Sequence, residues 1–135
     1  MHPLTDRLAA HGQALQLLAQ RQKVLAGNIA NADTPGFQAR DFDFAQALAQ
    51  ARGEGAVPAL QATSAAHLGA AGTPAQGTPT VALAWRTPEQ PALDGNTVDL
   101  DRERAAFADN ALRYEATLRF INHEVRTMLS AITGQ

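Results

Sequence analysis

Both ends of this 135-residue chain carry apolar residues in a heptad spacing, and this pattern restricts the fold more than any other feature. Near the N-terminus the spacing alternates between four and three residues, with His11 and Gln22 as two polar interruptions, through Leu4, Leu8, His11, Leu15, Leu18, Gln22, Leu25, Ile29 and Ala32. A repeat of this kind places the side chains in one stripe along a helix. Since a single helix cannot cover its own stripe, the pattern predicts a helix over residues 4–32 that pairs with a second helix.

The second helix is predicted at the other end of the chain. The same alternation runs through Phe107, Ala111, Tyr114, Leu118, Ile121, Val125, Met128 and Ile132. Asp99 or Asp101 suits the N-cap of this helix, and Gly134 suits its end. The two stripes predict a mainly α fold with long N-terminal and C-terminal helices paired as a coiled coil. Apolar residues outside the stripes are expected to remain free for other chains: Leu17, Val24, Leu112, Phe120 and Leu129.

Composition limits the core that such a chain can build. Apolar residues make up 45% of the sequence, but 29 of them are Ala, while Leu, Ile, Val and Phe together number 28. This is near the level at which a packed core becomes doubtful, so helices completed by neighbouring chains are expected. The length allows one domain at most. We expect a single unit over 1–135, with a helix in 1–34, a turn, loop and extended middle in 35–99, and a helix in 100–132.

The middle of the chain is predicted to be irregular. A short helix is expected over residues 41–51, a mobile or partner-ordered loop over 52–80, and a possible short strand over 81–85. Pro88 and Pro91 favour an extended arm, and Asp94-Gly95-Asn96 favours a turn into the last helix.

The sequence offers little basis for chemistry. A net charge of −2 argues against nucleic acid or an anionic membrane as the main partner, and cysteine is absent. The four histidines lack the spacing of a metal site, and the pairs Asp41/Asp43 and Asp99/Asp101 are interpreted as cap and turn acids. We therefore expect no catalytic residues, cofactor, metal or small-molecule substrate. No signal-peptide core and no apolar run of about 20 residues occur in the sequence.

A turn is predicted where the first helix must stop. Asn28, Asn31 and Asp33 precede Thr34-Pro35-Gly36-Phe37. Proline excludes the residue before it from the helical region, and glycine can take the positive φ of a tight turn. Read as single residues, this stretch is an ordinary helix stop with an apolar residue beside it.

Read as a motif, residues 28–37 and the continuation through residue 44 resemble the N-terminal signature of the flagellar axial proteins, which are rod, hook and hook-junction subunits. A second similarity lies in residues 93–103 and 111–115, and its key residues are Asp94, Gly95, Asn96 and Asp99. Together the similarities cover about 1–45 and 80–135. Their details point to a proximal rod subunit, and the longer members of the family carry additional domains for which this chain has no room.

The resemblance implies a structural subunit of the drive shaft that crosses the periplasm, exported by the flagellar type III apparatus without a cleaved signal. Its partners would be other rod subunits, copies of itself, the adaptor between rod and membrane ring, and the export gate. The residues expected to form the assembly seam are Leu8, Leu15, Leu18, Leu25, Ile29, Phe107, Tyr114, Leu118, Ile121, Val125 and Met128. Two alternatives stay open: a coiled-coil adaptor or export chaperone in the cytoplasm, and a rod or hook subunit of another type.

Overall fold

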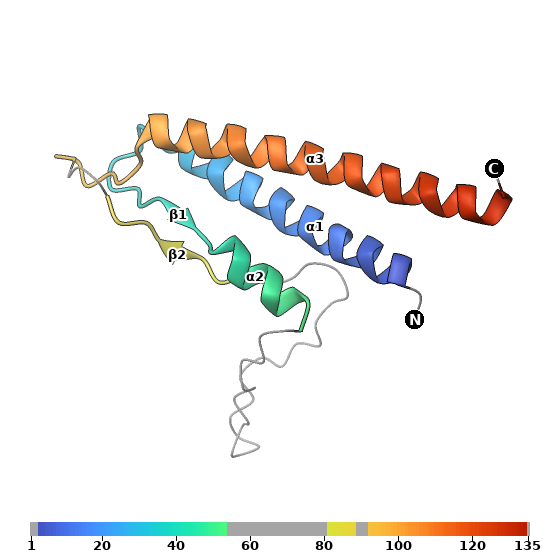
Figure 1. Cartoon of the computed structure of the whole chain (residues 1–135). Coiled ribbons are helices and arrows are strands. Elements are labelled where there is room, and N and C mark those ends of the chain that lie inside the picture. The colour runs from blue at the N-terminus through green and yellow to red at the C-terminus, as the bar shows by residue number, and fades with distance from the viewer. Residues whose placement is uncertain (1–2, 54–80, 89–91, 135) are drawn as a thin grey trace, which may run out of the picture.

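The chain folds as two long helices with a small two-stranded sheet and a short helix packed against them (Figure 1). The computed structural model describes residues 3–53, 81–88 and 92–134. Its helices are α1 (Pro3–Ala30), α2 (Phe44–Ala51) and α3 (Leu100–Thr133), and its strands are β1 (Arg40–Asp41) and β2 (Ala84–Trp85). This confirms the predicted mainly α fold with paired terminal helices and a short irregular middle.

Helices α1 and α3 run antiparallel along most of their length, so the end of α1 meets the beginning of α3 (Figure 1). Three contacts at different heights fix this register. Asn28 hydrogen-bonds to Glu103, and Asn110 donates to the carbonyl oxygen of Leu18. Near the other end the rings of His11 and Phe120 stack with centroids 6.0 Å apart.

The side of α3 that faces α1 differs from the prediction. Phe107, Tyr114, Ile121 and Met128 are partly buried, as the predicted stripe requires. The second row of that stripe is not buried: Leu118 is 37% exposed, Val125 38% and Ile132 81%. In its place a polar row of α3 faces α1, formed by Glu103, Asn110, Thr117 and Glu124.

Polar contacts explain this rotation of α3. Glu103 and Asn110 are at most 1% exposed, and each forms hydrogen bonds in the interior. Turning the apolar row toward α1 would remove these bonds and leave polar groups without partners, which is costly in a buried site. The hydrophobic pattern of α3 therefore identified a helix but not the face that it presents to α1.

The apolar core lies between α1 and α2. Leu17, Phe42 and Ala47 are buried together, and the residues packed around them include Val24, Phe44, Leu48 and Val81. Leu17 and Val24 were expected to remain free for other chains, and this expectation was wrong. The middle segment folds back and covers them, which a heptad count along α1 alone cannot reveal.

Local sequence signals set most of the helix ends. Asp43 caps α2 by accepting from the backbone N–H of Gln46, so α2 begins at Phe44 and not at Asp41. Asp99 caps α3 by accepting from the N–H groups of Asp101 and Arg102, and Gly134 closes the helix with a φ of 72°. The predicted short strand is found as β2 at Ala84–Trp85, paired antiparallel with β1.

The remaining predictions for the middle segment lie largely outside the described residues. The loop expected over 52–80 falls there from residue 54 onward, and so does Pro91. Within the described ranges no helix is long and apolar enough to cross a membrane.

Candidate functional site

The two segments that carry the family resemblance meet at the end of the helical pair where α1 stops and α3 begins (Figure 1). We call this place the junction and define it as residues 28–37 and 94–99. Residues that are about 60 positions apart in the sequence contact each other here. The segments therefore form one structural unit, although each was identified separately in the sequence.

Asn96 caps the end of α1 from a distance. Its side-chain Nδ2 donates to the carbonyl oxygens of Asn31, Ala32 and Thr34 at 3.0, 2.8 and 2.9 Å. The last turn of a helix leaves carbonyl groups without partners inside the helix, and these are usually satisfied locally or by water. Here a residue that is only 6% exposed satisfies carbonyls at the end of α1 and in the turn that follows it. The other side-chain atom of Asn96, Oδ1, accepts from the N–H of Val98 at 2.8 Å.

Two glycines supply the positive φ with which the backbones of the two segments meet. Gly36 has a φ of 72° and donates from its N–H to the carbonyl oxygen of Asp94 at 2.9 Å. Gly95 has a φ of 74°, and a Cβ added to it would lie 3.7 Å from the Cα of Gly36. A second backbone bond joins the N–H of Thr97 to the carbonyl oxygen of Phe37 at 3.0 Å. The positive φ expected at Gly36 is present, and the same conformation occurs in its partner Gly95.

The other motif residues of the first segment divide into structural and exposed positions. Asn31 donates to the carbonyl oxygen of Gly27 at 2.8 Å, and Thr34 donates to Asn31 Oδ1 at 3.1 Å. Phe37 is partly buried, whereas Pro35 and Asp33 are exposed. The turn is thus braced by its own side chains as well as by the second segment.

Asn28 links α1 to both β1 and α3. It is 2% exposed, its Nδ2 donates to the carbonyl oxygen of Arg40 at 2.7 Å and to Glu103 Oε2 at 3.2 Å, and its Oδ1 accepts from the N–H of Arg40 at 3.1 Å. A buried asparagine that uses both ends of its amide in this way fixes the position of its partners, since any shift leaves a polar group unpaired.

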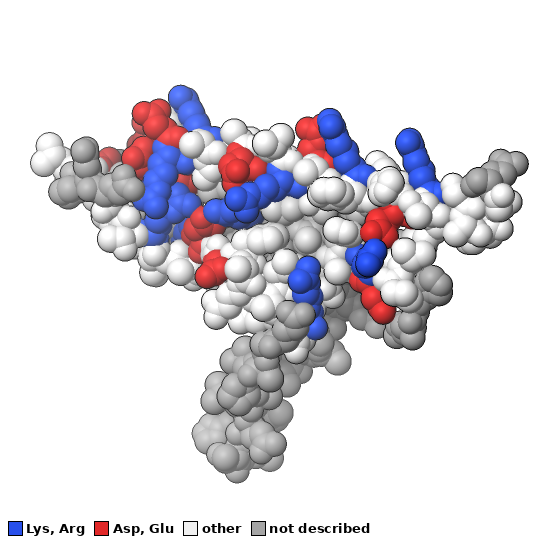
Figure 2. Space-filling view, viewed as in Figure 1, with Lys and Arg blue, Asp and Glu red and all other residues white. Residues whose placement is uncertain are grey.

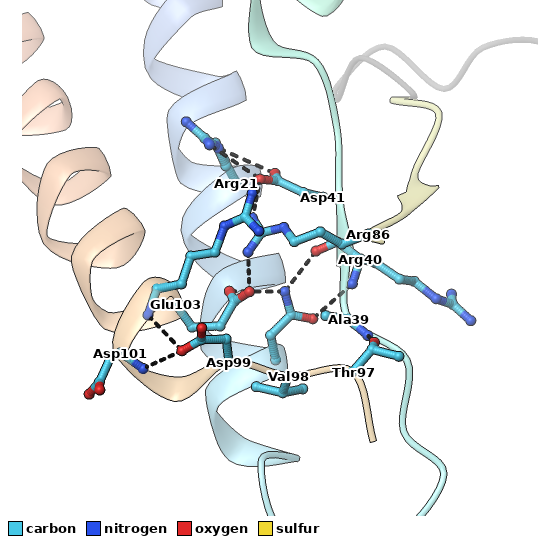
Figure 3. A network of polar contacts seen from close by, with 12 residues as sticks. Arg21, Ala39, Arg40, Asp41, Arg86, Thr97, Val98, Asp99, Asp101 and Glu103 are labelled. Atoms are coloured by element: carbon cyan, nitrogen blue, oxygen red, sulfur yellow. Dashed lines mark hydrogen bonds and ion pairs between the residues drawn. The ribbon is translucent and has the colours of Figure 1, made fainter. Parts of the chain in front are cut away.

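Next to Asn28 lies an ionic cluster formed by Arg21, Asp41, Arg86 and Glu103 (Figure 3). Arg86 is the central residue, because it contacts Asp41 Oδ2 at 2.5 Å and forms an ion pair with Glu103 Oε1. Arg21 contacts both carboxylate oxygens of Asp41, at 3.3 and 3.2 Å. Two positive and two negative groups balance, and together they join α1, β1, the residue after β2, and α3.

The surroundings of Asp41 stabilise its charged form. Burial raises the pKa of this carboxyl, but hydrogen bonds from Arg21, the N–H of Phe42 and Arg86 oppose it and hold the pKa below its ordinary value of 3.8. Asp41 is therefore a carboxylate at neutral pH, as its two ion pairs require.

The sheet adds a further contact on the outside of the cluster. Arg40 of β1 lies opposite Trp85 of β2, and its guanidinium carbon is 4.1 Å from the centre of the indole ring. This is the geometry of a cation–π interaction. Ala39 is completely buried. Its carbonyl oxygen accepts a hydrogen bond from the backbone N–H of Arg86, and its own N–H donates to Thr97 Oγ1.

Sequence reasoning found the junction residues and missed the ionic cluster. The pairs Asp41/Asp43 and Asp99/Asp101 were interpreted as cap and turn acids. Asp43 and Asp99 do cap α2 and α3, whereas Asp41 forms ion pairs with Arg21 and Arg86. Arg21, Arg86, Glu103 and Asn110 were not singled out. Glu103 lies in the first turn of α3, where an acidic side chain normally faces solvent and interacts with the helix dipole, so its burial could not be read from the sequence.

The chemistry available here is that of a structural joint. Among the described residues, no group of three or more His, Cys, Asp or Glu side chains is arranged to hold a metal ion. Figure 2 shows acidic and basic side chains intermixed on the visible face, most densely at the junction end. The charged groups of the cluster form ion pairs with one another, which is the arrangement of a structural contact.

Comparison of the chain with known proteins identifies its family. The family described as "Flagella basal body rod protein" matches residues 8–38. The chain is 48% identical to "Flagellar basal body rod protein FlgB" of Salmonella typhimurium, over 97% of this chain and 99% of that protein. It is 51% identical to the protein of the same name from Escherichia coli, over 89% and 88%, and 42% identical to that of Cereibacter sphaeroides, over 96% of each. The chain belongs to the flagellar basal-body rod protein family.

Proposed function

We propose that this chain is a structural subunit of the proximal part of the flagellar rod, without enzymatic activity, and that it helps to transmit torque across the periplasm. The observation that carries the proposal is the similarity to rod proteins along nearly the whole chain. The joining of both motif segments in one junction supports it, because the residues that define the resemblance then act together.

The geometry suits a load-bearing role. A rod under torque needs subunits whose helices keep a fixed register. The junction joins the end of α1 to the beginning of α3, and the ionic cluster joins both to the small sheet. Each link uses buried groups that lose partners when they shift, so the resistance to deformation is concentrated at this end of the molecule.

We further propose that the terminal helices form the contacts of assembly. The partners would be other rod subunits, neighbouring copies, the adaptor to the membrane ring and the export gate, and the chain would leave the cytoplasm through the flagellar type III apparatus without a cleaved signal. The predicted seam residues differ in their availability for this role. Leu18 and Leu25 are buried between elements of the same chain, whereas Leu118 and Val125 remain accessible.

The test is to delete the gene and restore it with a tagged copy. Basal bodies are then purified and probed for the tagged chain, and the cell fractions are probed in parallel. A rod subunit is expected in the basal bodies, and the deletion strain should lack rods. A chain confined to the cytoplasm, with rods that form and do not contain it, would contradict the proposal and favour an adaptor or chaperone.

A further inference from the structure

The segment of residues 81–88 forms the outermost layer of the small sheet, and we call it the strap. It contains β2, which pairs with β1, so that β1 lies between the strap and α1 (Figure 1). The backbone N–H of Arg86 continues this pairing by donating to the carbonyl oxygen of Ala39 at 2.9 Å. Leu83 and Trp85 are 45% and 60% exposed, whereas the side chain of Arg86 is 15% exposed. The strap is therefore a surface segment whose Arg86 side chain is directed inward.

The strap reaches α3 through the side chain of Arg86. Among the described helices and strands, α1 is the one whose backbone lies close to that of α3, and neither strand of the sheet does. The guanidinium group of Arg86 connects the two parts, because it contacts Asp41 of β1 and forms an ion pair with Glu103 of α3 (Figure 3). A surface segment and a long helix are thus joined by an ion pair and not by backbone packing.

Glu103 depends on this contact to balance its charge. Its side chain is 1% exposed, and its hydrogen bond from the amide of Asn28, at 3.2 Å, comes from a neutral group. A buried carboxylate that loses its cation is strongly destabilised, because it has lost water and has no charged partner. With the strap displaced, the first turns of α3 would have to move until Glu103 reached water. The closed position of α3 therefore requires the closed position of the strap.

The same contact acts in the opposite direction. Arg86 also contacts Asp41 at 2.5 Å, so it keeps one anion when the beginning of α3 moves away. It loses the other anion, Glu103, and the strap is then held more weakly. The coupling free energy between two such events is the same in both directions. The strap and the beginning of α3 consequently stabilise each other to an equal degree.

The other ion pair of the cluster differs in this respect. Arg21 and Asp41 join α1 to β1, and these two elements also lie close along their backbones. Replacing a buried ion pair by apolar residues is often neutral for stability, so stability alone does not explain the pair of Arg86 and Glu103. An apolar pair would lack the dependence of one segment on the other, because only a buried charge penalises the loss of its partner so strongly.

We propose that Arg86 and Glu103 form a latch, which makes the closure of α3 at the junction end conditional on the strap. The strap and the first turns of α3 then open and close together, and the two residues act as positioning residues for these segments. Whatever displaces the exposed strap also releases the beginning of α3, although it need not touch the helix. The latch is a property of the single chain and does not depend on the proposed rod function.

The first experiment measures hydrogen exchange of the α3 amides at residues 104–110 in the purified chain. Arg86→Met removes the cation of the strap, and exchange there should become about tenfold faster, within the range that coupled neighbouring residues give. Arg21→Met is the matched control, because Arg21 belongs to the same cluster and its side chain is 20% exposed, but it pairs with Asp41. In this control, exchange at 104–110 should stay within about twofold of the unaltered chain. Unchanged exchange in Arg86→Met, or an equal change in both variants, would overturn the proposal.

A double variant separates the latch from an ordinary stabilising contact. Arg86→Met combined with Glu103→Met removes the buried carboxylate as well, so α3 no longer needs the strap. Exchange at 104–110 should return to within about threefold of the unaltered chain, while the backbone N–H of residue 86 exchanges fast. Exchange at 104–110 that is as fast as in Arg86→Met alone would make Arg86 a stabilising residue only, against the proposal. If Arg86→Met alone does not fold, a folded double variant supports the latch and an unfolded one overturns it.

The reverse measurement changes α3 and observes the strap. In Glu103→Met the backbone N–H of Arg86 should exchange about tenfold faster, although Arg86 itself is unaltered and keeps its contact with Asp41. Glu115→Met is the control, since Glu115 is an acidic residue of α3 that pairs with Arg119 on the surface, and it should leave this exchange rate unchanged. An unchanged rate in Glu103→Met would show that the two segments close independently, and the latch would have to be abandoned.

Discussion

Asn96 offers the sharpest test of the junction. Of two substitutions at this position, the one that resembles asparagine more closely should lower the stability of the chain more. Asn96→Asp keeps the size and the Oδ1 acceptor for Val98, whereas Asn96→Ala removes the whole amide. The amide Nδ2 is the group that matters, since it donates to three carbonyl oxygens within 3.0 Å.

The expected magnitudes follow from these contacts. Asn96→Ala should lower the free energy of unfolding by roughly 2–3 kcal/mol, from lost hydrogen bonds and the lost cap at the end of α1. Asn96→Asp should cost about 1–2 kcal/mol more, because a carboxylate replaces the donor and faces three carbonyl oxygens. These lie at the negative pole of the α1 dipole, which adds to the repulsion.

The assay is urea unfolding of the purified variants, followed by circular dichroism, with hydrogen exchange of residues 31–37 as a local measurement. Exchange in this segment should rise more in Asn96→Asp than in Asn96→Ala. Asn122→Asp, at an exposed position of α3, is the control and should stay within about 0.5 kcal/mol of the unaltered chain. If Asn96→Asp were as stable as Asn96→Ala or more so, the three carbonyl contacts would not be what holds the junction.

Four further predictions concern the ionic cluster, the core and the turn. Arg86→Met should lower the free energy of unfolding by about 3–5 kcal/mol, because it leaves the buried Glu103 without its cation. Arg21→Met should lower it clearly less. Equal losses of the two variants in urea unfolding would contradict the central role of Arg86. The lowered pKa of Asp41 contributes stability that is complete above the ordinary value of 3.8 and is lost as the pH falls through the folded-state pKa. Asp41→Asn should therefore reduce the loss of stability in this acid range. An unchanged profile of stability against pH would refute the assignment. Leu17→Ala should cost about 3 kcal/mol and Leu112→Ala less than about 0.5 kcal/mol, because only Leu17 is buried. Gly36→Val should cost about 1–2 kcal/mol from its positive φ alone, since no atom crowds the position, and full stability in thermal unfolding would show that the turn can adopt another conformation.

The sequence by itself determined the features that depend on near neighbours in the chain. The two terminal helices follow from apolar residues at heptad spacing, and their ends follow from signals such as the Asp99 cap and the left-handed glycine at Gly134. The turn at Gly36 was predictable for the same reason, because proline and glycine restrict the backbone at their own positions.

Only the tertiary structure decided which surfaces meet. The predicted and observed faces of α3 share Phe107, Tyr114, Ile121 and Met128, so helical periodicity fits both rotations almost equally well. The choice between them depends on Asn28 and Arg86, which bind Glu103 across 75 and 17 positions of the chain. In the same way, the roles of Asn96 as a cap for α1 and of Leu17 as a core residue depend on contacts with distant segments of the chain. Hydrophobic spacing records how much apolar surface a helix carries, whereas directional hydrogen bonds and ion pairs between remote residues decide where that surface points.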